Sequence, residues 1–90
     1  MECRVKRKVR VKNAHGLHTR PATVIAKLLQ RSKSSVAFTY GEETINAKSI
    51  MGILTLAAAK NSLVTITVEG EDAEETMQWI IEAFENKFGE

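Results

Sequence analysis

Apolar residues recur along the chain at two spacings, which together predict the element order βαββαβα. Residues 5–11, 36–40 and 64–68 alternate apolar with polar side chains, as half-buried strands do. A turn at Gly41 leads from the second of these segments into a short strand around Ile45, which completes a hairpin. Strands of this kind carry one apolar face each, so we expect an α+β sheet with helices on one side and water on the other.

Helical spacing predicts three helices between and after the strands. The first helix begins around Pro21, and the second follows Ser49, which stands where an N-cap belongs. The third helix is the clearest, because Asp72 and Glu75 resemble a capping box and Lys87 would lie in its last turn. Its apolar stripe comprises Ala73, Met77, Ile80, Ile81, Phe84 and Phe88.

Length and composition fit one compact domain over residues 1–90. The chain is 43% hydrophobic and 27% charged, which is ordinary for a globular protein. No apolar run approaches the roughly 20 residues that span a bilayer, and the first residues alternate in charge instead of forming an apolar leader. Cys3 is the single cysteine and has no partner for an internal disulfide. We therefore expect a cytoplasmic monomer without membrane insertion.

Charge is distributed unevenly, although the net charge is only +2. Residues 1–20 hold seven Lys or Arg and one acid, whereas residues 69–90 hold eight acids and one base. A basic stretch is typical of nucleic-acid binding, but these cations alternate with valines and so form the wet face of a strand. Arg7 interrupts the apolar face, which indicates a sheet edge or a strand end. Phe38 and Tyr40 fit a core face better than a base-stacking surface, so we expect no nucleic-acid partner.

The candidate chemistry lies in the string at residues 16–22. His18 stands just before a helix, beside backbone N–H groups that have no partner within the helix, and such groups form an anion site. Arg20 adds a guanidinium that matches phosphate oxygens, and Pro21 fixes the turn so that the N–H groups of Thr19 and Arg20 point forward. Imidazole titrates near neutral pH, so a nucleophilic nitrogen is available. The pattern predicts that His18 accepts and relays a phosphoryl group.

Simpler interpretations of the same residues exist. His18 would then merely cap a helix, with Arg20 as a solvated side chain. His15 and His18 have a spacing that suggests a metal, but two histidines without cysteine or acid partners make a weak site. The string lacks a P-loop, an Asp-rich metal site and a second acid–base group. We therefore expect a stoichiometric phosphoryl carrier without cofactor or metal, and not a self-sufficient enzyme.

The string Gly-Leu-His-Thr-Arg-Pro-Ala at residues 16–22 resembles the active-site signature of the histidine-containing phosphocarrier (HPr) family. This family belongs to the bacterial phosphoenolpyruvate-dependent phosphotransferase system. The resemblance covers nearly the whole chain and includes Asn13, Ala-Lys-Ser-Ile-Met-Gly at residues 47–52 and Glu-Gly-Glu-Asp-Ala at residues 69–73. It implies an open-faced β-sandwich, in which three helices cover one face of a four-stranded antiparallel sheet.

The resemblance also implies roles for individual residues. Enzyme I, charged from phosphoenolpyruvate, would phosphorylate His18 on Nδ1, and the phosphoryl group would pass to an enzyme IIA component in sugar uptake or its regulation. Arg20 would stabilise the phosphoryl group, together with the backbone of Thr19 and Arg20. Ser49 matches the regulatory serine that HPr kinase/phosphorylase modifies. The docking residues would be Thr23, Met51 and Leu54.

Three residues depart from the family pattern or have no role in it. Asn61 stands where the family usually has glycine, and asparagine tolerates the left-handed turn that this position requires. His15 and Cys3 have no assigned role. An alternative function is a regulatory protein of the same fold that acts through Ser49 alone. Family members of that kind lack the histidine, so His18 argues against it as the sole function.

Overall fold

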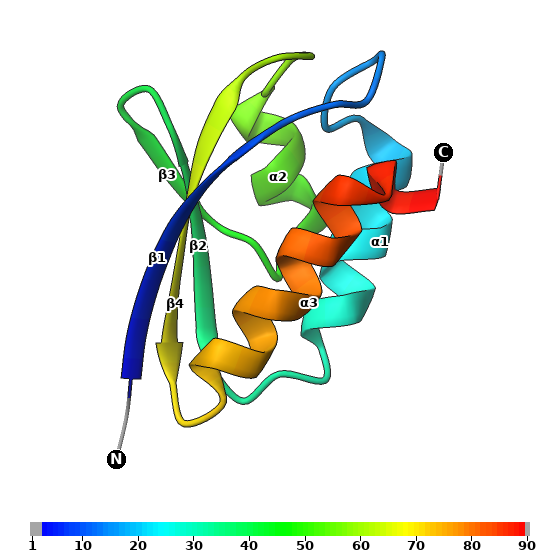
Figure 1. The fold of residues 1–90 in the computed structure, drawn as a ribbon. Helices are drawn as coiled ribbons and strands as arrows, with labels where there is room; N and C mark the ends of the chain where they lie inside the picture. The colour runs from blue at the N-terminus through cyan, green and yellow to red at the C-terminus, as the bar shows by residue number, and fades with distance from the viewer. Residues whose placement is uncertain (1–2, 90) are drawn as a thin grey trace.

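The computed structural model describes residues 3–89, which form the predicted elements in the predicted order (Figure 1). They are β1 (Cys3–Arg10), α1 (Thr19–Leu29), β2 (Ser35–Tyr40), β3 (Glu43–Asn46), α2 (Ile50–Leu56), β4 (Leu63–Gly70), α3 (Ala73–Glu85) and a final 3₁₀ turn (Lys87–Gly89). None of the helices in this range is long and apolar enough to cross a membrane. The order βαββαβα is confirmed.

The four strands form one sheet in the order β1-β4-β2-β3, with each neighbouring pair antiparallel. The register places Val5 opposite Val68 and Phe38 opposite Ile66. Because side chains alternate between the two faces of a strand, these residues share one face. The three helices cover that face, and the other face of the sheet stays open (Figure 1). The predicted one-sided α+β fold is therefore confirmed.

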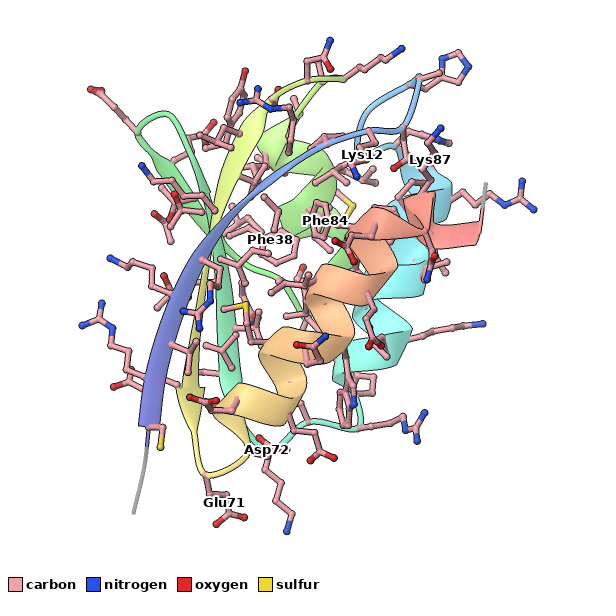
Figure 2. All side chains as sticks on the ribbon, in the orientation of Figure 1. Lys12, Phe38, Glu71, Asp72, Phe84 and Lys87 are labelled. Carbon is pink, nitrogen blue, oxygen red and sulfur yellow. The ribbon has the colours of Figure 1, made fainter. Side chains whose placement is uncertain are left out.

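Aromatic rings join the sheet to α3 at the centre of the core. Phe38 is fully buried, and its ring centroid lies 5.9 Å from that of Phe84 on α3 (Figure 2). Phe84 in turn contacts Phe88, with centroids 4.8 Å apart in an edge-to-face arrangement. Tyr40 was expected on the same core face, but it is 38% exposed because it ends β2 beside the hairpin turn. The burial of Phe38 removes it as a surface for base stacking.

The other large, fully buried side chains come from every layer of the fold. They include Ile25, Leu29, Ile53, Val64, Ile66, Val68 and Ile80. The predicted sheet-edge position of Arg7 is also confirmed, because β1 is an edge strand. The exposed guanidinium of Arg7 donates a 2.9 Å hydrogen bond to the carbonyl oxygen of Lys6.

The C-terminal helix ends earlier than its apolar stripe predicts. α3 stops at Glu85, and both Lys87 (φ 52°) and Phe88 (φ 55°) adopt left-handed backbone angles. The prediction that Lys87 lies in the last helical turn is therefore wrong. Phe88 is buried all the same, because the reversed chain returns its ring to Phe84. Phe84 and Phe88 are four residues apart, which is also the spacing of neighbours on one face of a helix. The sequence pattern therefore predicts a longer α3 than the structure has.

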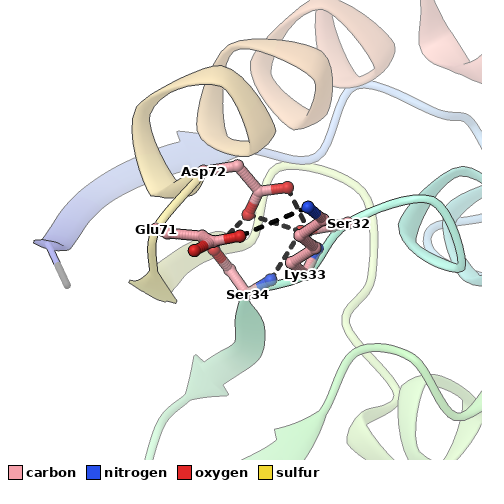
Figure 3. A network of polar contacts seen from close by, with 5 residues as sticks. All are labelled: Ser32, Lys33, Ser34, Glu71 and Asp72. Atoms are coloured by element: carbon pink, nitrogen blue, oxygen red, sulfur yellow. Dashed lines mark hydrogen bonds and ion pairs between the residues drawn. The ribbon is translucent and has the colours of Figure 1, made fainter. Parts of the chain in front are cut away.

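The capping-box prediction for α3 is also wrong. Asp72 occupies the N-cap position, but its side chain makes no capping hydrogen bond. The carboxylate instead accepts hydrogen bonds from the loop between α1 and β2 (Figure 3). The backbone N–H of Lys33 donates at 3.0 Å, and the hydroxyls of Ser32 and Ser34 also donate to Asp72. Asp72 therefore connects two loops that are distant in sequence.

These contacts lower the pKa of the Asp72 carboxylate, which in turn accepts hydrogen bonds from the hydroxyls of Ser32 and Ser34. The backbone N–H of Lys33 and the hydroxyl of Ser34 lower the pKa of Asp72 from its ordinary value of 3.8 to about 2. Ser32 and Ser34 are buried, and Ser32 shares a further hydrogen bond of 2.6 Å with Thr76. Loss of the carboxylate would leave the buried hydroxyl of Ser34 without its acceptor.

We predict that Asp72→Asn lowers the free energy of unfolding at pH 7 by about 1–3 kcal/mol, the usual cost of weakening charge-assisted hydrogen bonds, here to a half-buried carboxylate. A lowered pKa stabilises the fold fully above the ordinary value and loses this effect as the pH falls through the folded value. The difference between wild type and variant should thus shrink between about pH 4 and pH 2. Urea denaturation at several pH values measures it.

Glu71→Gln is the matched control. Glu71 forms a 3.4 Å ion pair with Lys33 in which both side chains are mostly exposed, so its loss should change stability by less than about 1 kcal/mol. An Asp72→Asn variant that is as stable as the control at pH 7 would contradict the role assigned to the carboxylate.

Candidate functional site

The loop before α1 is anchored to the C-terminal turn. Asn13 is buried, and its side-chain amide donates a 2.8 Å hydrogen bond to the carbonyl oxygen of Lys87. The carbonyl oxygen of Asn13 accepts a 3.0 Å hydrogen bond from the backbone N–H of Gly16. The left-handed backbone of Lys87, which ends the helix early, thus lies where the candidate site begins.

Gly16 allows the loop to approach the segment that follows α2. Its φ of +68° lies in the left-handed region, and a Cβ atom here would overlap the carbonyl oxygen of Ala58. That carbonyl accepts a 2.9 Å hydrogen bond from the backbone N–H of Leu17, which is itself buried. The close approach therefore requires glycine and fixes the residue just before His18.

His18 is the N-cap residue of α1. Its backbone is extended (φ −82°, ψ −167°), and its carbonyl oxygen accepts the first helical hydrogen bond from Ala22 at 3.0 Å. Its imidazole makes no capping hydrogen bond, so His18 occupies the N-cap position through its backbone alone. The side chain is half-buried, with its ring 5.8 Å from that of His15 in an edge-to-face arrangement.

The first turn of α1 directs two backbone N–H groups toward the position in front of His18. Thr19 and Arg20 precede the first i→i−4 hydrogen bond, so their N–H groups have no carbonyl partner within the helix. Pro21 is buried and has no N–H group to satisfy. No acidic residue lies in this turn, so the positive end of the helix dipole is not offset locally. The arrangement suits a phosphoryl group.

The two predicted side chains around this turn differ in exposure. Arg20 is exposed on the first turn, where its guanidinium can reach an anion beside His18. Thr23 is half-buried, and its hydroxyl donates a 2.8 Å hydrogen bond to the carbonyl oxygen of Thr19. This bond occupies the Thr23 hydroxyl within the helix and leaves its methyl group for contacts with neighbours.

Ser49 is the N-cap of α2, as predicted. Its hydroxyl oxygen accepts a 3.1 Å hydrogen bond from the backbone N–H of Gly52, and the residue is half-buried. Ser49 also lines a surface depression of about 340 Å³ between α1 and α2, which Lys27, Lys48 and Met51 share. The ammonium group of Lys48 donates a 2.9 Å hydrogen bond to the carbonyl oxygen of Ser32.

The predicted docking residues occupy neighbouring positions on α1 and α2, which pack against each other. Met51 is 71% exposed, whereas Leu54 and Thr23 are half-buried. Ile50, which the sequence did not single out, is 39% exposed beside Met51. An apolar residue directly after an N-cap is the signal that could have identified it, because the first turn of a helix often faces solvent.

No group of three or more His, Cys, Asp and Glu side chains within residues 3–89 is arranged to hold a metal ion. His15 is exposed in the loop, and Cys3 is exposed at the start of β1.

Known proteins are similar to this chain over most of its length. The family described as "PTS HPr component phosphorylation site" matches residues 5–86. A phosphocarrier protein HPr from Chlamydia pneumoniae is 46% identical over 80 residues, which cover 89% of this chain and 74% of that protein.

Solved structures give the same result for the fold. A crystal structure of HPr-C-His from Thermoanaerobacter tengcongensis has a TM-score of 0.92 at 34% identity, covering 96% of this chain and 97% of that one. An HPr dimer from the same bacterium has a TM-score of 0.77 at 35% identity, covering 91% and 94% of the two chains.

Proposed function

Because the chain belongs to the HPr family, the phosphocarrier proteins of the phosphotransferase system, we propose that His18 is the residue that carries the phosphoryl group. The observation that supports this most is the position of His18 at the N-cap of α1, with an imidazole that the helix does not use for capping. A phosphoryl group on this ring would lie beside the N–H groups of Thr19 and Arg20 and the positive end of the helix.

Transfer would proceed in two matched steps. In the first step, the lone pair of His18 Nδ1 attacks the phosphorus of a phosphohistidine on enzyme I. The N–P bond on enzyme I breaks as the new N–P bond forms, and the electron pair returns to the imidazole of the donor. In the second step His18 is the donor, and an enzyme IIA component accepts the group. His18 ends unchanged after each cycle, so the protein serves as a stoichiometric carrier and not as an enzyme.

Arg20 would neutralise charge on the phosphoryl oxygens during transfer. Phosphoryl transfer depends mostly on positioning and on stabilising the equatorial oxygens, which a guanidinium can contact through two N–H groups. Arg20 is exposed, so its side chain can approach an incoming group without first breaking a buried contact.

Partner proteins would dock on the surface around His18. Met51 projects strongly into solvent, and Thr23 and Leu54 border it on α1 and α2. Methionine side chains adapt to differently shaped surfaces, which suits a protein that must bind both a donor and an acceptor. A small apolar patch of this kind fits transient complexes. We infer a cytoplasmic monomer that meets enzyme I and enzyme IIA in turn.

Ser49 would add regulation by HPr kinase/phosphorylase. A phosphate at the N-terminus of α2 is compatible with the helix dipole, so it would not unfold the helix. It would place negative charge beside Met51 and so repel acidic partners. Lys27 lines the same depression as Ser49 and is exposed, so it could approach that phosphate.

We predict that His18→Ala abolishes phosphoryl acceptance and leaves the fold intact, because the helix does not depend on the imidazole for capping. Intact mass spectrometry after incubation with phosphoenolpyruvate and enzyme I should show one acid-labile phosphate on the wild type and none on the variant. A variant that still carries this phosphate, or an unmodified wild type beside an active enzyme I control, would disprove the proposal.

Arg20→Ala should slow transfer from enzyme I by about 10- to 100-fold, since it removes one charged stabiliser of the transferring group and leaves the nucleophile in place. Rapid-quench measurement of phosphohistidine formation gives the rate. Arg20→Lys is the matched control and should recover part of the loss through its charge, although lysine lacks the two-pronged geometry. Equal rates for wild type and Arg20→Ala would exclude the role.

Substitutions of Ser49 should separate its capping role from its regulatory role. Ser49→Ala should cost about 1 kcal/mol of stability through loss of the N-cap and leave transfer unchanged. Ser49→Asp keeps a capping oxygen but adds charge, so it should retain stability and slow acceptance from enzyme I by about tenfold. Thermal denaturation and the same rapid-quench assay measure the two effects. Unimpaired transfer by Ser49→Asp would contradict regulation by charge.

A further inference from the structure

The phosphocarrier function proposed above assigns no role to the outer edge of β1. Within the described sheet, β1 is an edge strand that pairs with β4 alone. The backbone N–H of Val11 donates to the carbonyl oxygen of Ser62 at 2.9 Å, so the backbone of Val11 faces β4. The N–H and C=O groups of successive residues point to opposite edges of a strand. Those of the odd-numbered residues, like Val11, face β4, so those of the even-numbered residues face outward. These residues are Arg4, Lys6, Lys8 and Arg10.

The same four residues give the outer edge a strong positive charge. Their side chains alternate with Val5 and Val9 and therefore lie on the open face of the sheet, and all four are exposed. Their cross-strand neighbours on β4 are Glu69, Thr67, Thr65 and Leu63. One carboxylate thus faces four cations along this row. The edge therefore offers outward-facing backbone groups, of which the carbonyl oxygen of Lys6 accepts from Arg7, together with an excess of positive charge.

A groove on the other face adjoins the same edge. It has a volume of about 270 Å³ and lies between β1 and α3. Its apolar walls are Val9, Ile81 and Phe84, and its polar lining includes Arg7, Lys12 and Glu85. A strand placed beside β1 would direct every second side chain toward this groove and the others toward the basic row.

We propose that the outer edge of β1 binds an extended acidic peptide segment of a partner protein as a fifth strand. Addition of a strand to a sheet edge is an established mode of peptide recognition, in which backbone hydrogen bonds give affinity and alternate side chains give specificity. Here the peptide alternates acidic and apolar residues. Its carboxylates lie opposite Lys6 and Lys8, and an apolar side chain enters the groove beside Phe84.

Charge complementarity selects this occupant over others. A second copy of β1 would place like charges opposite one another, which is destabilising across strands. A single-stranded nucleic acid needs aromatic side chains for stacking, and the described strands carry none on the open face, because Phe38 and Tyr40 both have the core-facing parity of β2. Lysines on an edge also discourage aggregation, but that role does not require an apolar groove beside them.

One existing contact must change when the strand binds. The guanidinium of Arg7 donates to the carbonyl oxygen of Lys6, which faces the outer edge. An incoming backbone N–H takes over this acceptor, and the released guanidinium is then available for a peptide carboxylate. Arg7 therefore covers the edge when it is empty and contributes charge when it is occupied.

The test uses a fluorescein-labelled peptide of eight residues that alternates glutamate with valine. Fluorescence anisotropy should show saturable binding to the whole protein, and Lys6→Glu with Lys8→Glu should weaken it at least about tenfold. Lys27→Glu with Arg31→Glu changes the net charge equally at exposed sites on α1 and just after it, and should change affinity less than about twofold. Amide exchange followed by NMR should show new protection at Lys6 and Lys8.

The outcomes discriminate between strand addition and general attraction. Equal binding of a peptide with the glutamates and valines in separate blocks, without amide protection, would overturn the proposal. Tighter binding of a single-stranded RNA, dimerisation through β1 or no binding at low salt would also overturn it. If the Lys6→Glu, Lys8→Glu variant fails to fold, Lys6→Gln with Lys8→Gln replaces it. His18→Ala should bind the peptide like the wild type, so this result is independent of phosphoryl transfer.

Discussion

The constraint on which the fold depends is the alternation of side chains along four antiparallel strands. It places Val5, Phe38, Ile66 and their neighbours on one face of the sheet, where they must be covered. All three helices therefore lie on that face (Figure 1). The same alternation places Arg4, Lys6, Lys8 and Arg10 of β1 on the other face, so a single periodicity determines both the core and the charged open surface.

The candidate site follows from this arrangement through the backbone. Covering one face with α1 and α2 brings the loop before α1 against the segment that follows α2. There the hydrogen bond from Leu17 to Ala58 and the absence of a side chain at Gly16 set the position of His18. Left-handed residues make this possible at the end of α2, where Ala57 has a φ of 54°. The backbone contacts of Gly16 and Leu17 thus set where His18 lies at the start of α1.

Much of the fold could be predicted from sequence, because strand alternation and helical spacing are local signals. The cap at Ser49 and the left-handed turn at Asn61 (φ 73°) were also predictable, since each depends on residue chemistry at one position. The predictions that were wrong depend on contacts between residues distant in the sequence or on a change of backbone direction. Asp72 looked like a cap because nothing local shows that Ser32 and Ser34 approach it, and Phe88 looked helical because four-residue spacing does not reveal a reversed chain.

The candidate site was predictable in its residues but not in its surroundings. The string around His18 indicates an anion site because helix N-termini have the same free N–H groups in every protein. The anchoring carbonyls of Ala58 and Lys87 could not be inferred, because any residue type supplies a carbonyl oxygen. The exposure of Ile50 was missed for a related reason, since it depends on how α2 is oriented on the sheet.

The solvent exposure of this site suits a carrier that must release what it binds. A buried site with several paired guanidinium groups would hold a phosphoryl group strongly, because charges interact strongly where the dielectric constant is low. Here the stabilising groups are two N–H groups at a helix terminus and one exposed arginine, all accessible to water and ions. If His18 carries the group as proposed, its phosphorylated state is stabilised only weakly. Donor and acceptor proteins can then shift the group in either direction by adding modest contacts of their own.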